Sequence, residues 1–273
     1  MNIFTRHKRT LLLTAIALTV GGAFWAAGRS KTPVRESMPE IRITANADSD
    51  DDAAAYDIYE ETYNHVRTKQ PDIDYDTVKV RIRAQQQYFS KRYAAASEKN
   101  RAAVLSDAKK YLINAIYDTI FPHWYDTPWD FYGTTRTPRQ GYIACGYFVT
   151  TVLADAGFQI PYVKWAQLAS EPVIVKIASD IKRFGNRPMS EVIAYLNKTG
   201  DGLYIVGLDC HIGYIYKADT VMRFIHSNYY HAEIGVMSEP IVGDNPLNNS
   251  KYRVIGKLLS DETVRNWVTG AKY

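Results

Sequence analysis

The sequence predicts an α+β fold, in which helices come first and an antiparallel sheet follows. Between residues 53 and 121, apolar side chains recur every three or four positions, as on one face of a helix. From residue 203 onward the apolar stretches are short and separated by turn residues, which is typical of strands. With 273 residues, 46% of them hydrophobic, the chain can bury the core of one domain and carry extensions.

The composition limits the classes of partner. The formal charge is only +4, and the Lys and Arg residues are dispersed along the chain. Nucleic-acid binding requires a clustered basic face, so we expect no nucleic acid as a partner. Tyrosine occurs 21 times. Tyrosine side chains suit clefts that bind polar, extended ligands, and they are equally common on half-buried helix faces.

Residues 1–27 have the layout of a signal peptide or signal anchor. Arg6, Lys8 and Arg9 make a basic start, and residues 11–27 form a charge-free run. Small residues near the end of the run suit cleavage, whereas its length is also close to the minimum for a membrane-spanning helix. We therefore expect a periplasmic or other extracytoplasmic location. An uncleaved segment 11–27 would anchor the protein in the inner membrane.

Two regions precede the strand-rich part of the chain. Residues 28–52 are polar, contain prolines and end in a cluster of aspartates, so we expect a linker. The cluster lacks the spaced ligand series of an EF-hand calcium loop. Residues 53–121 are expected to form a helical region, with helices over about 53–66, from about Asp76, and over about 101–120. This region either packs against the later domain or precedes it as a small bundle.

The elements of the second half follow an aromatic, irregular segment at 123–140. That segment either walls a cleft or fills a gap between the helices and the rest of the fold. After it, a helix is expected to begin at Cys145 and to end near Gly157, and another covers 189–197. The expected strands cover 203–208, 211–216, 221–226, 233–237 and 252–258, and a last helix covers 260–269.

Three residues in these elements suggest nucleophilic thiol chemistry. Cys145 opens its helix, where unpaired N–H groups and the helix dipole favour a thiolate. His211 begins one strand and His226 ends the next, so an antiparallel pairing brings the two rings together. In such a site Cys145 attacks a carbonyl, His211 accepts the thiol proton, and His226 orients His211. For an isolated cysteine, burial as a small apolar residue is the simpler interpretation.

The order of these elements resembles the NlpC/P60 family of papain-like cysteine peptidases, which cleave cell-wall peptides. The resemblance rests on the cysteine that opens a helix, on residues 201–206, on His-Ile-Gly-Tyr-Ile at 211–215, and on Phe-Ile-His at 224–226. It spans roughly residues 129–258 and implies a papain-like catalytic domain over 122–273, in which the Cys-bearing helix packs on an antiparallel sheet.

The resemblance also implies roles for individual residues. It makes Cys145 the nucleophile, His211 the base and His226 the orienting residue, and it implies peptidoglycan or another peptide as substrate, with no cofactor. Where the family commonly has Asp-Cys-Ser-Gly, this chain has Ala-Cys-Gly-Tyr at 144–147, which indicates a divergent member.

Four further residues are candidates for contacts with the substrate. Gln140, five residues before Cys145, could donate to the oxyanion together with the backbone N–H of Cys145, as a glutamine does in papain-like enzymes generally. Trp129 lies in the aromatic segment, Tyr147 lies at the departure from the family pattern, and Ser227 follows His226.

Competing interpretations remain open at this point. In an exported chain with two cysteines, a disulfide between Cys145 and Cys210 would exclude the catalytic site, although strand alternation predicts that Cys210 and His211 point to opposite sides. The same alternation opposes a metal site built from Cys210, His211, His226 and His231, so we expect no metal. An acyltransferase and an inactive cell-wall-binding domain are the functional alternatives.

Overall fold

A computed structural model describes residues 71–273, all of which belong to one compact unit. The signal segment, the linker and the predicted helix at 53–66 lie outside the described residues. Within the described range, no helix is both long enough and apolar enough to cross a bilayer. The architecture is α+β, as predicted. Its helices are α2 (Tyr75–Ala95), α3 (Glu98–Asn114), π-helical η1 (Ala115–Ile120), α4 (Phe121–Trp124), α5 (Cys145–Asp155), α6 (Tyr162–Ala166), α7 (Ser170–Ile177), α8 (Met189–Thr199), α9 (Pro246–Asn249) and α10 (Asp261–Thr269).

Six strands form one antiparallel sheet in the order β1-β6-β2-β3-β4-β5. Their bounds are β1 (Ser179–Gly185), β2 (Gly202–Leu208), β3 (Ile212–Ala218), β4 (Val221–Ser227), β5 (Val236–Pro240) and β6 (Tyr252–Lys257). Five of them correspond to predicted strands, although β5 begins three residues later than predicted. Strand β1 was not predicted, because it is a largely polar edge strand whose only buried residue is Phe184.

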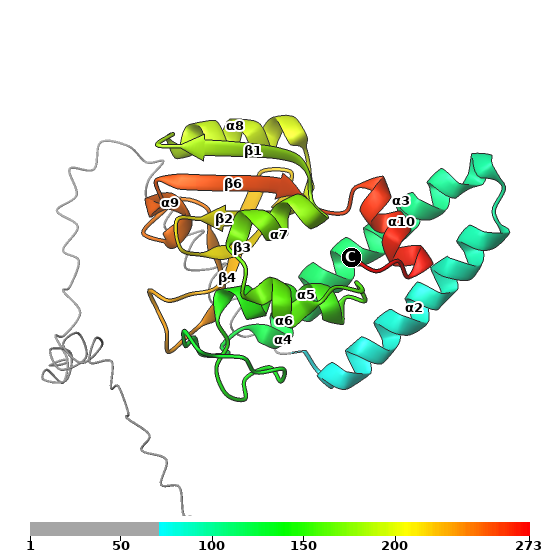
Figure 1. Cartoon of the computed structure of the whole chain (residues 1–273), viewed down its shortest axis with the longest axis horizontal. Coiled ribbons are helices and arrows are strands. Elements are labelled where there is room, and N and C mark those ends of the chain that lie inside the picture. Colours follow the sequence, from blue (N-terminus) through cyan, green and yellow to red (C-terminus); the bar gives the residue numbers. More distant parts are fainter. Residues whose placement is uncertain (1–70) are drawn as a thin grey trace, which may run out of the picture. The chain divides into compact units, whose positions relative to one another are not determined.

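The N-terminal helices form a hairpin. Asp74 caps α2 by accepting a hydrogen bond from the backbone N–H of Thr77 at 3.0 Å. The hairpin continues from α3 without a break into η1, so the predicted helix at 101–120 is confirmed in extent, with a π-helical last part. Helix α10 packs on both α2 and α3, and in Figure 1 it lies beside the hairpin.

The sheet separates two layers of helices. Helices α5 and α7 pack on one face, where the side chains of Tyr214 and Ile225 join the core that also includes α2 and α3. Helix α8 belongs to a second core with Phe224 and Ile215 on the other face, and its Tyr195 contacts the rings of Phe184 and Tyr204. Figure 1 shows α8 beside β1. The hydroxyl of Tyr214 donates a hydrogen bond to the Val149 carbonyl at 2.7 Å, which fixes α5 against strand β3. Because α5 is held in this way, the position of its first residue is defined relative to the ends of the strands.

Candidate active site

Cys145 is the first residue of helix α5 and is partly buried. The preceding residue, Ala144, has no side chain that could cap the helix, so the first N–H groups remain available. The backbone N–H groups of Ile212, Gly146 and Cys145 itself lower the pKa of the thiol, and the last two belong to the helix N-terminus. Burial outweighs them, however, and leaves the pKa of the thiol above its ordinary value. The resting form is therefore the thiol.

Gly146, the residue after Cys145, allows the backbone of another segment to approach helix α5 closely. A Cβ atom at this position would lie 2.3 Å from the carbonyl oxygen of Ala166, at the end of α6. Only glycine allows this approach, because the obstacle is backbone. The Cys-Gly pair therefore permits α6 to pack directly against the first turn of α5, and Ala166 lines the cleft beside Cys145.

The two predicted histidines lie together at the end of the sheet. His211 immediately precedes β3, and its Nε2 lies 2.8 Å from Nδ1 of His226 on β4. Both rings are buried, and burial holds the pKa of each well below its ordinary value. His211 lines the same cleft as Cys145, and Nδ1 is its ring nitrogen that does not contact His226. The structure thus brings together the three residues predicted for the catalytic roles.

Glu239 extends the series of side-chain contacts formed by His211 and His226, and the sequence did not predict it. Its Oε1 lies 2.7 Å from Nε2 of His226, and it is 4% exposed. Burial raises the pKa of Glu239 to about 8, against the opposing influence of His231 and Arg223. The predicted strand ended at Met237, which pairs with His226 in the sheet. One signal in the sequence could have identified Glu239: it lies two residues after Met237, and therefore on the same face of the strand.

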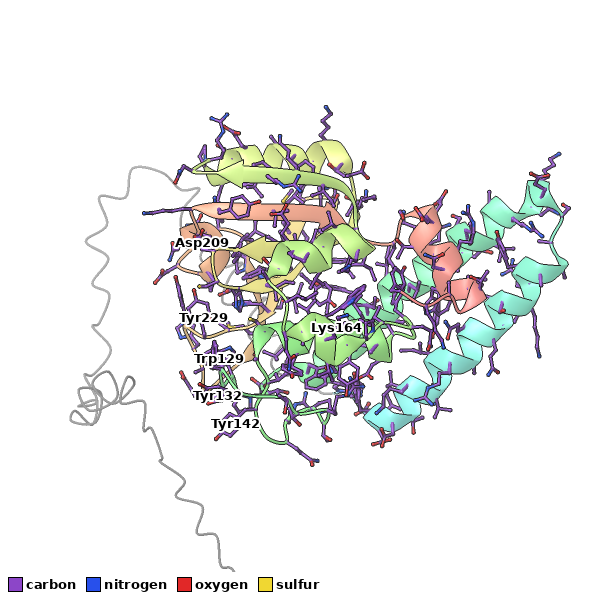
Figure 2. All side chains as sticks on the ribbon, in the orientation of Figure 1. Trp129, Tyr132, Tyr142, Lys164, Asp209 and Tyr229 are labelled. Atoms are coloured by element: carbon purple, nitrogen blue, oxygen red, sulfur yellow. The ribbon has the colours of Figure 1, made fainter. Side chains whose placement is uncertain are left out.

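Two hollows meet at Cys145 and His211. The larger, of about 610 Å³, is the aromatic hollow, and the smaller, of about 470 Å³, is the acidic hollow. The aromatic hollow is walled by Trp129, Phe131, Tyr132, Tyr147 and Tyr229. The acidic hollow contains the carboxylates of Glu171 and Asp209 and the ring of Tyr252. Figure 2 shows Asp209, Tyr229, Trp129 and Tyr132 in succession along one side of the fold.

Two of the four predicted substrate contacts lie in the cleft, and the other two, Ser227 and Gln140, do not. Trp129 and Tyr147 line the aromatic hollow, and the hydroxyl of Tyr147 accepts a hydrogen bond from Nε2 of Gln167 at 3.2 Å. Ser227 instead is buried and donates to the Ile143 carbonyl at 2.7 Å, so it ties β4 to the segment before α5.

Gln140 is not brought to the cleft. It is exposed and lines neither hollow, because its backbone belongs to a tight loop: its carbonyl accepts from Oγ1 of Thr135 at 2.6 Å and its N–H donates to the Thr137 carbonyl. The backbone N–H groups at the start of α5 can serve as oxyanion donors at Cys145 without Gln140.

Cys210 lies beside the site and not on the far side of the sheet. It precedes β3 in an exposed turn and lines both hollows, so the alternation rule did not apply to it. The turn is held by Asp209, whose carboxylate accepts from the backbone N–H groups of Lys251 and Tyr252. Both cysteines are free thiols.

The site contains a thiol, a neutral imidazole in the same cleft, and a buried polar chain behind that imidazole. Among residues 71–273, no group of three or more His, Cys, Asp or Glu side chains is arranged to hold a metal ion. These parts suffice for nucleophilic attack on a carbonyl with proton transfer through His211. No protein-family model, no curated protein and no solved structure matches this chain.

Proposed function

We propose that the protein is an exported cysteine hydrolase that cleaves amide bonds in peptidoglycan peptides. The observation that carries the proposal is the chain His211–His226–Glu239, which ends in the cleft where Cys145 opens helix α5. Export is inferred from residues 1–27. The substrate class is inferred from the resemblance of residues 129–258 to NlpC/P60 peptidases.

The reaction would begin from the neutral thiol of Cys145 and the neutral imidazole of His211. Nδ1 of His211 accepts the thiol proton while Sγ of Cys145 attacks the carbonyl carbon, and the backbone N–H groups at the start of α5 bind the oxyanion. When the tetrahedral intermediate collapses, the C–N bond breaks and His211 returns its proton to the leaving amine. Water then attacks the thioester, His211 accepts its proton, and the carboxylic acid leaves with regeneration of the thiol. Each step moves one proton between His211 and a reacting atom.

The shape of the cleft suits an extended substrate. Hollows open on both sides of the nucleophile, so a peptide can occupy both while its scissile bond lies at Cys145. The aromatic hollow has no Asp, Glu, Lys or Arg among its lining residues, whereas the acidic hollow has Glu171 and Asp209. Hydrogen bonds lower the pKa of both carboxyl groups, so both are carboxylates at neutral pH, and Glu171 is paired with Arg183.

The proposal is tested with Cys145→Ala in the full chain. Purified sacculi are incubated with wild type or variant, and newly released amino groups are measured. We expect Cys145→Ala to lose activity by about 1000-fold or more, because no other thiol in the cleft lies at the start of a helix. The matched control is Cys210→Ala, which removes the second thiol of the same cleft and should change turnover by less than about threefold. Unchanged turnover in Cys145→Ala would contradict the proposal.

Acyl transfer is the second candidate, because the Asp209 carboxylate in the acidic hollow could attract an amine as acyl acceptor. The same sacculus assay distinguishes it when an amine is added: incorporation of that amine into the product favours transfer over hydrolysis. Binding of wild-type protein to sacculi without release of amino groups would instead favour a cell-wall-binding domain.

A further inference from the structure

The polar chain behind the cleft uses every ring nitrogen of the two histidines except one. Nε2 of His211 contacts Nδ1 of His226 at 2.8 Å, and Nε2 of His226 contacts Oε1 of Glu239 at 2.7 Å. The His226 ring stacks on Phe224, with centroids 4.0 Å apart, so its orientation is fixed. The side chains of His226 and Glu239 are 0% and 5% exposed, so solvent does not compete for these contacts. Only Nδ1 of His211 lies outside this series of contacts, and His211 lines the cleft that contains Cys145.

The protonation of Glu239 decides the direction of every hydrogen bond in this chain. A carboxylate can only accept, so Nε2 of His226 must then carry the proton. A neutral His226 then accepts at Nδ1 from Nε2–H of His211, and Nδ1 of His211 is left with a lone pair. If Glu239 is instead protonated and donates to His226, each bond reverses, and Nδ1 of His211 carries a hydrogen. In that state His211 cannot accept a proton from the thiol.

We propose that Glu239 is a positioning residue that sets the tautomer of both histidines, so that His211 is a competent base only while Glu239 is a carboxylate. The inference deepens the proposed function and rests on it for its catalytic consequence. The arrangement of protons in the resting protein is independent of any substrate.

The surroundings of Glu239 place its ionisation within an accessible pH range. Burial raises its pKa, Asp244 raises it further, and the electrostatic influence of His231 and Arg223 lowers it. Arg223 is on β4 and also donates to the hydroxyl and the carbonyl of Ser238, on the strand that carries Glu239. Activity should therefore rise with pH as Glu239 loses its proton, and it should fall on acidification before the lowered pKa values of the two histidines are reached.

The first measurement is the ring-nitrogen NMR spectrum of the full chain labelled with ¹⁵N-histidine, as a function of pH. In wild type we expect both rings to carry hydrogen at Nε2 at high pH and the pattern to reverse as Glu239 becomes protonated. Glutamine has no such proton to gain, so Glu239→Gln should remove the pH dependence. Glu233→Gln changes an exposed glutamate in the preceding loop and is the matched control, with wild-type spectra.

The second measurement is the pH profile of sacculus hydrolysis. Glu239→Leu should lower kcat by about 100-fold with KM within about threefold, because the substrate site is intact while the base is not. In Glu239→Gln, the change of hydrolysis rate with pH that is due to ionisation of Glu239 should be absent. If Glu239→Leu does not fold, the glutamine variant decides: a wild-type profile and wild-type tautomers in it would overturn the inference.

The two measurements separate the inference from the proposed function. Tautomers that follow Glu239 in a protein without hydrolytic activity would support the positioning role and reject the hydrolase. Hydrolysis that depends on Cys145, with tautomers unaffected by either Glu239 variant, would support the hydrolase and reject the positioning role.

Discussion

The two ends of helix α5 both meet buried polar groups, but they use them differently. At the C-terminal end, the Asp155 carboxylate accepts from the Tyr75 hydroxyl at 2.8 Å and from Arg136 at 2.5 Å. Tyr75 in turn accepts from the indole N–H of Trp124 at 2.8 Å. At the N-terminal end, the chain of His211, His226 and Glu239 ends at a ring nitrogen in an open cleft.

The network at Asp155 is enclosed by other protein groups and suits a structural role, whereas the network at His211 borders an open cleft and suits a reactive role. A carboxylate near a helix C-terminus faces the negative end of the dipole, and burial raises the pKa of Asp155. Arg136 and Tyr75 lower that pKa again, so the charge is compensated and ties α5 to helix α2. At the N-terminal end, His231 and Arg223 lower the pKa of Glu239, but the series of contacts ends at His211, which lines an open cleft. We therefore expect changes at one end to affect stability and changes at the other to affect activity.

Among the changes that contrast the two ends of α5, the largest expected effect comes from Gly213→Ala at the reactive end. A Cβ at Gly213 would lie 2.7 Å from Cε2 of Phe224 and 2.9 Å from Cβ of His226, so Phe224 and the β4 backbone that carries the His226 ring must shift. Displacement of this ring breaks its bond to His211. We expect sacculus hydrolysis to fall by about 100-fold, equivalent to about 2.7 kcal/mol in the barrier.

The control for this substitution is Gly185→Ala on edge strand β1, where an added Cβ meets nothing within 4 Å. It should retain wild-type activity. Because overpacking also costs about 1–3 kcal/mol of stability, turnover is measured well below the melting temperature, where the protein is folded. Wild-type turnover in Gly213→Ala would show that the reactive end tolerates displacement of His226, and the contrast between the two ends would fail.

At the structural end, Asp155→Ala should lower the free energy of unfolding by about 2 kcal/mol. The change leaves the Tyr75 hydroxyl without its buried acceptor and Arg136 without its charge partner. Denaturant unfolding measures the loss, and the rate of Cys145 alkylation by iodoacetamide should stay within about twofold of wild type. Asp107→Ala breaks the exposed pair with Arg92 and should cost less than about 0.5 kcal/mol. An equally small loss in Asp155→Ala would contradict a structural role.

The fold could be predicted from the sequence wherever one strong local signal decided the element. Helix α5 begins at Cys145 as predicted, and Gly157 follows its end with a positive φ of 98°. Strand β1 was not predicted, because an edge strand with one buried residue shows little alternation of apolar and polar residues. The π-helical turn η1 could not be distinguished, since its apolar spacing over six residues also fits an α-helix.

The sequence could predict only those site residues that lie on the predicted helix and the predicted hairpin. Cys145, His211 and His226 follow from one helix start and one hairpin, and the structure brings them together. Glu239 was missed because β5 continues beyond the predicted strand. Gln140 and Cys210 were misplaced because both lie outside regular elements, where side-chain bonds such as those of Thr135 and Asp209 set the backbone.

The smallest expected effect concerns the cleft at the reactive end, where a residue can matter for binding without contributing to stability. Tyr132 is 84% exposed and lines the aromatic hollow, so its ring is available to a substrate. We expect Tyr132→Ala to raise KM about fivefold, close to 1 kcal/mol of binding, with kcat and the melting temperature unchanged.

Tyr142 offers the matched control for this last substitution. It belongs to the same segment before α5 and is exposed, but it lines neither hollow, and Figure 2 shows its position relative to Tyr132. Tyr142→Ala should leave KM unchanged. An equal rise of KM in both variants would mean that the whole aromatic segment, and not the aromatic hollow, contacts the substrate. A change of kcat in Tyr132→Ala would place its ring at the reacting bond, since an interaction made only in the transition state lowers kcat and kcat/KM together.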